Sequence, residues 1–140
     1  MRLVLDTNVV VSAILWQGIP GRLFALAGDK EIRLHTSQAL IDELADVLSR
    51  KKLAKNVEAT GLTVSQILEN YRKIITLVTA RSLSKRVSID ADDDVVLATA
   101  LAAKADLIVS GDRKHLLILK QFGGIPIVTV AQALALLESA

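Results

Sequence analysis

Two aspartates stand where the sequence predicts that buried β-strands end. Asp6 directly follows the apolar residues 3–5, and Asp112 follows the apolar residues 107–109 after a Ser-Gly pair. Ligands of open parallel sheets bind beyond the carboxyl ends of the strands, so these two carboxylates are candidates for one shared site. Either aspartate alone is also typical of a turn or a helix N-cap. Their recurrence at matching strand ends favours the shared site.

Two more acids lie on predicted helices and border the core. At about 100° per residue, Glu43 lies beside Val47 at the edge of the apolar face of its helix. Asp94 shares a face with Leu97 and Leu101, which predicts that its side chain points to the core side. A glutamate at such a boundary also commonly reaches water, and aspartates also gather at helix N-termini as caps. Both alternatives stay open at this stage.

A bound cation would explain how four carboxylates can converge. Unpartnered carboxylates repel one another, which raises their pKa values and destabilises the fold. No lysine or arginine has a clear place at the centre of the group, and all-oxygen ligation suits Mg²⁺ or Mn²⁺. The chain has no cysteine, which excludes zinc sites that need sulfur. His35 in a predicted strand and His115 in a polar turn are interpreted as structural or exposed side chains, not as ligands.

The composition indicates a globular protein without a membrane span. With 140 residues, 51% of them hydrophobic, the chain is expected to form one domain over residues 1–140. Its apolar runs are shorter than the ~18 residues that a bilayer crossing needs. Asp6 interrupts the first apolar run too early for a secretory signal, and the lack of cysteine agrees with a reducing compartment. We therefore expect a cytoplasmic protein.

Basic residues are grouped along the chain, although the net charge is only +2. Acidic chemistry within basic surroundings suits a phosphate polyanion as partner. Short runs of charge are also typical of solvated faces, so no single group decides between the two interpretations. The groups are Arg50-Lys51-Lys52-Lys55, Arg72-Lys73, Arg81-Lys85-Arg86 and Arg113-Lys114.

Predicted strands and helices alternate along the chain. Apolar residues recur every three to four positions in the helices, whereas the strands are short Val, Leu and Ile runs. Such alternation predicts parallel strands joined by helical crossovers, with helices on both faces of the sheet. The predicted strands are residues 2–5, 32–35, 107–109 and 125–129. The predicted helices are residues 9–15, 22–27, 38–49 and 64–75, one ending at Lys104, a short one after Asp112 and one starting at Ala131.

Four motifs in this order resemble the PIN-domain family. They are Asp6-Thr7-Asn8 after a strand, Glu43 inside a capped helix, Asp94 at the start of residues 94–100, and Ser110-Gly111-Asp112 after a strand. The resemblance covers essentially the whole chain, and it is closest to the toxin-like PIN proteins of prokaryotic toxin–antitoxin systems. It implies a three-layer α/β fold with a central parallel β-sheet of four to five strands and helices on both faces.

The resemblance implies a magnesium- or manganese-dependent endoribonuclease. Asn8 and Ser110 fall where the family often places polar support for the metal site, and Asp93 is expected to share the work of Asp94. One or two metal ions would activate a water that attacks the RNA phosphodiester bond, leaving 5′-phosphate and 3′-hydroxyl ends. The side chains that match the family's catalytic, metal-binding acidic quartet are Asp6, Glu43, Asp94 and Asp112.

Partners follow from the resemblance and from the composition. A toxin-like PIN protein would pair with a small antitoxin, a segment of which docks in a groove and reaches the acidic pocket with a cation. The many apolar residues on several helices are also compatible with a homodimer, because excess apolar surface must be covered. RNA contact is expected mainly from the basic groups, which bind phosphates and carry little sequence information.

Two other functions remain open. An acid-pocket phosphatase also places aspartates at the ends of parallel strands, but Asn8 stands where its usual second aspartate would be. The chain could also be an inactive PIN-like module that binds RNA or protein without cutting. A covalent aspartyl-phosphate would support the phosphatase, and RNA binding without Mn²⁺ affinity would support the module.

Overall fold

A six-stranded sheet forms the centre of the protein in the computed structural model, which describes residues 1–16, 18–28, 32–81 and 91–138. The strands lie in the order β3-β2-β1-β4-β6-β5. Neighbouring strands run parallel except for β5 and β6, which form an antiparallel pair at one edge. The strands are β1 (Arg2–Leu5), β2 (Arg33–Thr36), β3 (Ile75–Leu77), β4 (Leu107–Val109), β5 (Gln121–Phe122) and β6 (Ile125–Val128).

The strand register gives the sheet two separate apolar faces. Val4 lies opposite Ile108 and Leu5 lies opposite Val109, so equivalent residues of β1 and β4 point the same way. Leu5 and Val109 belong to one core cluster, and Val4 and Ile108 belong to the other. The same register brings the carboxyl ends of β1 and β4 side by side, and the residues that follow each strand must therefore meet.

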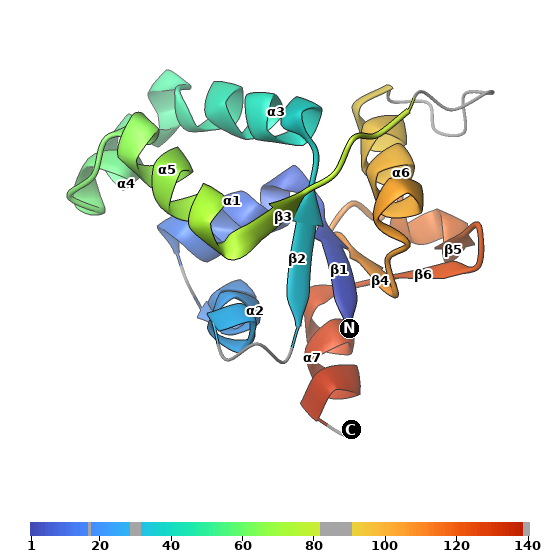
Figure 1. The fold of residues 1–140 in the computed structure, drawn as a ribbon. Helices are drawn as coiled ribbons and strands as arrows, with labels where there is room; N and C mark the ends of the chain where they lie inside the picture. The colour runs from blue at the N-terminus through green and yellow to red at the C-terminus, as the bar shows by residue number, and fades with distance from the viewer. Residues whose placement is uncertain (17, 29–31, 82–90, 139–140) are drawn as a thin grey trace.

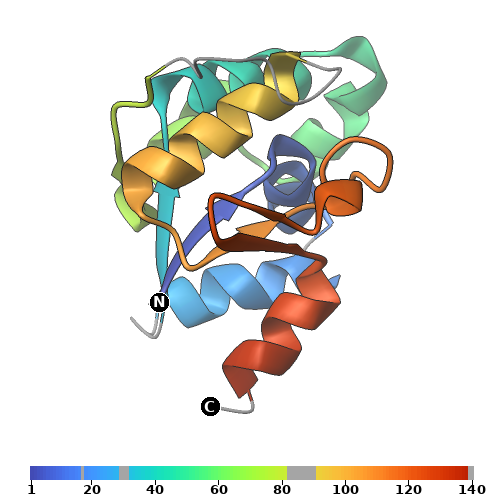
Figure 2. The same cartoon turned by 90° about the vertical axis from the view of Figure 1, so that its right-hand side faces the viewer.

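Helices cover both faces of the sheet (Figures 1 and 2). On one side α6 packs against β1 and β2, and on the other α7 packs against β4 and α2. No helix in the described ranges is long and apolar enough to cross a membrane. The helices are α1 (Thr7–Leu15), α2 (Gly18–Gly28), α3 (Gln38–Leu48), α4 (Ala54–Ala59), α5 (Val64–Ile74), α6 (Ala91–Ala103) and α7 (Val130–Glu138), with short 3₁₀ turns at Lys51–Leu53 and Leu117–Leu119.

Helix α3 connects the two sides at the carboxyl edge of the sheet. It packs against both α1 and α6. Ser37 occupies the N-cap position of α3 but makes no capping hydrogen bond with its side chain. Its hydroxyl instead lies 2.9 Å from the hydroxyl of Thr99 on α6, and both residues are buried. The Ser37 hydroxyl thus links the start of α3 to α6 and does not cap α3.

The α/β fold with a mostly parallel sheet and helices on both faces is as expected, but the sheet has six strands instead of four to five. The sequence pattern places Ile75 in a helix, whereas α5 ends at Ile74 and Ile75 is extended. Ile75 begins β3, which pairs with β2 through Leu34. The second added strand is the two-residue β5, which reverses into β6 through Gly123 and Gly124, both at positive φ. Strands this short depend on pairing with a neighbour, which periodicity within one segment does not reveal.

Candidate functional site

Asp6 and Ser110 meet just beyond the paired ends of β1 and β4. The backbone N–H of Asp6 donates to the carbonyl oxygen of Val109 at 2.9 Å, which continues the β1–β4 pairing by one residue. The hydroxyl of Ser110 donates to Asp6 Oδ2 at 2.9 Å. Asp6 is 7% exposed and Ser110 is fully buried. A carboxylate this deep in the fold is held in one direction, toward β4.

The Asp6 carboxylate is not used to cap a helix. Asp6 is the N-cap residue of α1 with extended backbone angles, and its carbonyl oxygen accepts from the N–H groups of Val9 and Val10. Its side chain, however, makes no capping hydrogen bond within α1. The N-cap interpretation that the sequence left open therefore describes the backbone of Asp6 and not its carboxylate.

Asp112 holds the turn that follows β4. Its Oδ1 accepts from the backbone N–H groups of Lys114 at 3.1 Å and His115 at 3.0 Å. Desolvation by burial acts to raise the pKa of Asp112, but these hydrogen bonds and the nearby His115 ring outweigh it and lower the pKa. The Asp112 carboxylate thus has the turn role that the sequence presented as one alternative, and it lies at the same edge of the sheet as Asp6.

The Ser110 hydroxyl links the two strand-end aspartates. Its oxygen accepts from the backbone N–H of Asp112 at 3.0 Å while its proton goes to Asp6. One buried side chain thus fixes the carboxylate of Asp6 relative to the turn that carries Asp112. Ser110, which the sequence predicts as polar support for the metal site, thus contacts both strand-end aspartates. Asn8, for which the same role was predicted, is exposed and joins none of these hydrogen bonds.

Glu43 reaches the same edge of the sheet from α3. Thr7, the first residue of α1, donates its hydroxyl to Glu43 Oε2 at 3.0 Å. Thr7 is buried and Glu43 is half-buried. The sequence singled out Glu43 but not Thr7, although Thr7 lies in the middle of the Asp-Thr-Asn motif. Its place beside Asp6 was the available signal.

On α6, Asp93 and not Asp94 lies on the most buried face of the helix. Asp93 is 7% exposed and is followed at helical spacing by Val96, Leu97 and Ala100, all at 1% or less. Asp94 is half-buried, and Leu101, which was predicted to share its inward face, is 43% exposed. The predicted helix phase was therefore wrong by about one residue. Residues 95–103 are apolar on every side except at Thr99, so periodicity could not select the inward face.

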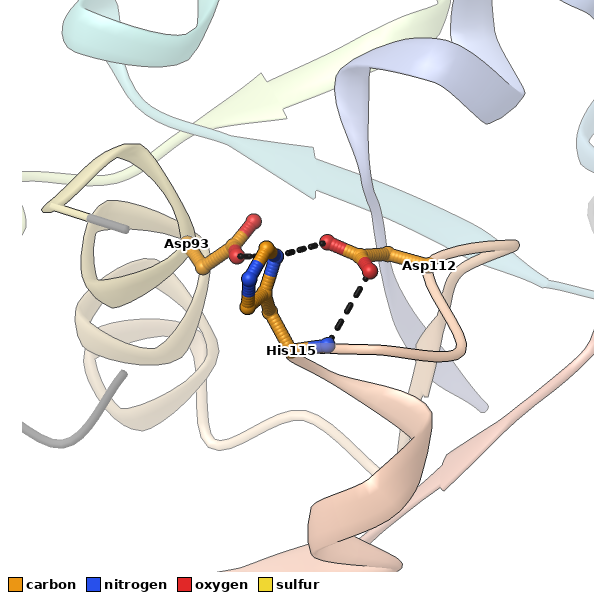
Figure 3. Close-up of side chains that lie close together, drawn as sticks. All are labelled: Asp93, Asp112 and His115. Carbon is orange, nitrogen blue, oxygen red and sulfur yellow. Dashed lines mark hydrogen bonds and ion pairs between the residues drawn. The ribbon is translucent and has the colours of Figure 1, made fainter. Parts of the chain in front are cut away.

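His115 lies between Asp112 and Asp93 (Figure 3). Its Nδ1 is 3.3 Å from Asp112 Oδ2 and 3.6 Å from Asp93 Oδ2. The sequence interpretation of His115 as a structural or exposed side chain missed this position, because the helix that carries Asp93 is distant in sequence. His35, by contrast, is structural: it is buried on β2, where desolvation lowers its pKa, and its Nδ1 donates to the carbonyl oxygen of Arg33.

The donor set at this edge fits a hard divalent cation. Within the described residues, ligand atoms from Asp93, Asp112 and His115 all lie within 4.8 Å of one another. Hydrogen bonds through Ser110 and Thr7 connect Asp6 and Glu43 to the same edge. Carboxylate oxygens are suitable ligands for Mg²⁺ or Mn²⁺. The side chains come from four separate elements, so tertiary structure and not local sequence assembles them.

An apolar groove of about 570 Å³ lies away from these acids, between α1, α2, α4 and α5. Phe24 and Tyr71 stack at its wall with ring centroids 6.0 Å apart. Among its described lining residues none is acidic. The groove therefore lacks the carboxylates that make the carboxyl edge of the sheet the candidate site.

Comparisons with known proteins identify the family of the chain. A sequence model of a family described as "PIN domain" matches residues 2–114, a range that includes Asp6, Glu43 and Asp112. No curated protein matches the chain. The fold is similar to a chain in the crystal structure of VapBC2 from Rickettsia felis bound to a DNA fragment from their promoter. That match has a TM-score of 0.62 and 19% sequence identity, and it covers 92% of this chain and 98% of the other.

Proposed function

Since the chain belongs to the PIN-domain family, we propose that it is a metal-dependent endoribonuclease that hydrolyses RNA phosphodiester bonds. The observation that supports this most is the meeting of Asp6, Asp112 and Asp93 at one edge of the sheet, joined by Ser110 and His115. Burying carboxylates from separate elements lowers the stability of the fold unless a cation or a hydrogen-bond partner compensates their charge.

The residues proposed to hold Mg²⁺ or Mn²⁺ are the strand-end and helix acids described above. When bound, such an ion neutralises the carboxylates, polarises the scissile phosphate and lowers the pKa of a water molecule. Asp93 and Asp94 both remain in this proposal, because they are adjacent in the first turn of α6. The full set is Asp6, Glu43, Asp93, Asp94 and Asp112.

The chain's own residues do the positioning. Ser110 and Thr7 each donate a hydroxyl proton to a carboxylate, which keeps Asp6 and Glu43 oriented before RNA arrives. Arg113 and Lys114 are exposed immediately after Asp112. Cations beside the site are suited to bind RNA phosphates, an interaction that supplies affinity but little sequence selectivity.

The test is RNA cleavage by the purified protein with Mn²⁺, with Mg²⁺ and with EDTA. We expect cleavage only with a divalent ion, with 5′-phosphate and 3′-hydroxyl ends, and its loss in Asp112→Asn. Asp106→Asn is the matched control, because Asp106 lies at the opposite end of β4 and is exposed. Cleavage in EDTA, or 2′,3′-cyclic phosphate products, would refute the proposed chemistry. A covalent aspartyl-phosphate would identify a phosphatase instead.

We further propose that the protein is the toxin of a toxin–antitoxin pair. The support is the resemblance to toxin-like PIN proteins and the fold shared with a chain of VapBC2 from Rickettsia felis. Induced expression in a bacterial host is expected to arrest growth, and Asp6→Asn is expected to relieve the arrest at equal protein level. Growth arrest that is the same for both chains would contradict a toxic nuclease.

Self-association is the remaining proposal about partners. Large apolar side chains such as Ile118, Trp16 and Leu77 are at least half exposed. Covering apolar surface favours association, and symmetric dimers are the commonest result. Size-exclusion chromatography with light scattering over a range of protein concentrations is expected to show a dimer. A monomeric mass at the highest concentration would contradict it.

A further inference from the structure

His115 is held so that its ring nitrogen faces two carboxylates. The backbone N–H of His115 donates to Asp112 Oδ1, which fixes the residue within the turn after β4. The next residue, Leu116, is fully buried and donates its N–H to the carbonyl oxygen of Asp112 at 3.3 Å. The turn and the buried leucine therefore set the direction of the imidazole toward Asp93 on α6 (Figure 3).

A hydrogen bond alone does not explain this arrangement well. A ring N–H points in one direction, yet Nδ1 is 3.3 Å from one carboxylate oxygen and 3.6 Å from the other. The first distance is long for a hydrogen bond and the second is outside the range. Nδ1 and the two carboxylate oxygens would need to move together by only a few tenths of an ångström to reach the spacing of neighbouring ligands on one octahedral ion, which is about 3 Å when each bond is about 2.1 Å.

We propose that His115 Nδ1 is a metal ligand together with Asp93 and Asp112, and that this nitrogen makes the site prefer Mn²⁺ to Mg²⁺. The inference rests on the proposed metal-dependent function and deepens it. Mg²⁺ is bound almost entirely by oxygen, whereas first-row transition ions accept imidazole readily. His115 lies one residue beyond the range that the family model matches, so the match assigns it no role.

Pulsed electron paramagnetic resonance of the protein loaded with Mn²⁺ alone tests the ligand directly. A coordinated imidazole gives ¹⁴N modulation of the Mn²⁺ signal, and ¹⁵N labelling of histidine changes its pattern. The chain has only two histidines, so the assignment needs two variants. The modulation is expected to disappear in His115→Gln and to persist in His35→Gln, which alters the buried histidine of β2.

Calorimetric titration with Mn²⁺ and with Mg²⁺ tests the preference. His115→Gln is expected to lower Mn²⁺ affinity by about 10-fold or more and to change Mg²⁺ affinity much less, because loss even of a residue that only supports a ligand costs about 10–100-fold. Equal weakening for both ions would show that His115 only orients Asp112 and would overturn the inference.

Different experimental results would overturn this inference and the proposed function. Mn²⁺ bound by the wild-type chain without nitrogen modulation would overturn the role of His115 while leaving the nuclease proposal intact. No detectable Mn²⁺ or Mg²⁺ binding would overturn both. A wild-type spectrum without nitrogen modulation overturns the role of His115 without any variant, so that outcome does not depend on how well His115→Gln folds.

Discussion

The carboxyl ends of β1 and β4 both present an aspartate, but the two carboxylates are held in different ways. Asp6 is deeply buried, stands at the start of α1 and leaves the helix uncapped by its side chain. Asp112 is more exposed and uses one oxygen to hold two backbone N–H groups of its own turn. The position in the sheet determines where a strand-end acid lies. The local backbone determines how much of its hydrogen-bonding capacity is left for a ligand.

The largest expected effect is on RNA cleavage by Asp6→Asn. We expect cleavage to fall by about 100-fold or more. Asp6 is a proposed metal ligand, and losing a residue that only supports such a ligand already costs roughly 10–100-fold. The asparagine oxygen still accepts from Ser110, so the melting temperature is expected to change little. Cleavage assays with Mn²⁺ beside thermal unfolding provide the check. Near-normal cleavage by a folded variant would remove Asp6 from the site.

Ser110→Ala addresses the link between the two strand ends. We expect a cleavage loss of about 10–100-fold, as for other residues that orient a ligand. We also expect about 1–3 kcal/mol lower free energy of unfolding, because the partly buried N–H of Asp112 and the buried carboxylate of Asp6 each lose a partner.

Thr99→Val is the matched control for Ser110→Ala. It removes another fully buried hydroxyl, which bonds to Ser37 and not to a strand-end acid. Thr99→Val is expected to lower stability and to keep cleavage near the wild-type rate. Similar cleavage losses in the two variants would mean that Ser110 acts through stability alone.

Asp112→Ala and Asp112→Asn separate the turn role of Asp112 from its charge. Alanine removes the acceptor of the Lys114 and His115 N–H groups, at a cost of about 1 kcal/mol typical of a lost cap. Asparagine keeps an oxygen there, so Asp112→Asn is expected to be more stable than Asp112→Ala by about that amount, while the two variants lose cleavage to the same extent. Urea unfolding in EDTA measures the difference. Equal stability of the two variants would show that the turn does not depend on this side chain.

The smallest expected effect is on the pH dependence of the free energy of unfolding. It comes from His35 on β2 and not from the acids at the ends of β1 and β4. Desolvation lowers the pKa of His35 below its ordinary value of 6.5, so the unfolded chain binds the proton more tightly than the folded one. The contribution of His35 to stability is therefore present above pH 6.5 and is lost as the pH falls through the window below it. Urea unfolding at pH 7.5 and pH 5.5 is expected to show a smaller loss in His35→Gln than in the wild type. The same loss in both chains would assign the acid sensitivity to other groups.

Much of the architecture could be predicted from local patterns. Thr63 and Gln66 form the reciprocal capping box of α5, which begins at Val64 as the predicted helix 64–75 does. Residues 107–109 form β4 with the predicted bounds. These features depend on neighbours a few positions apart, and hydrogen bonds and burial across such distances follow from the residue types themselves.

The sequence by itself determined which acids stand at strand ends, because the type and spacing of residues decide where a buried strand stops. Only the tertiary structure decided that Asp93 leads the buried stripe of α6, that Ser110 bridges Asp6 and Asp112, and that His115 faces Asp93. The physical reason is that periodicity describes angles within one element. Distances between elements depend on strand register and on the packing of helices against the sheet.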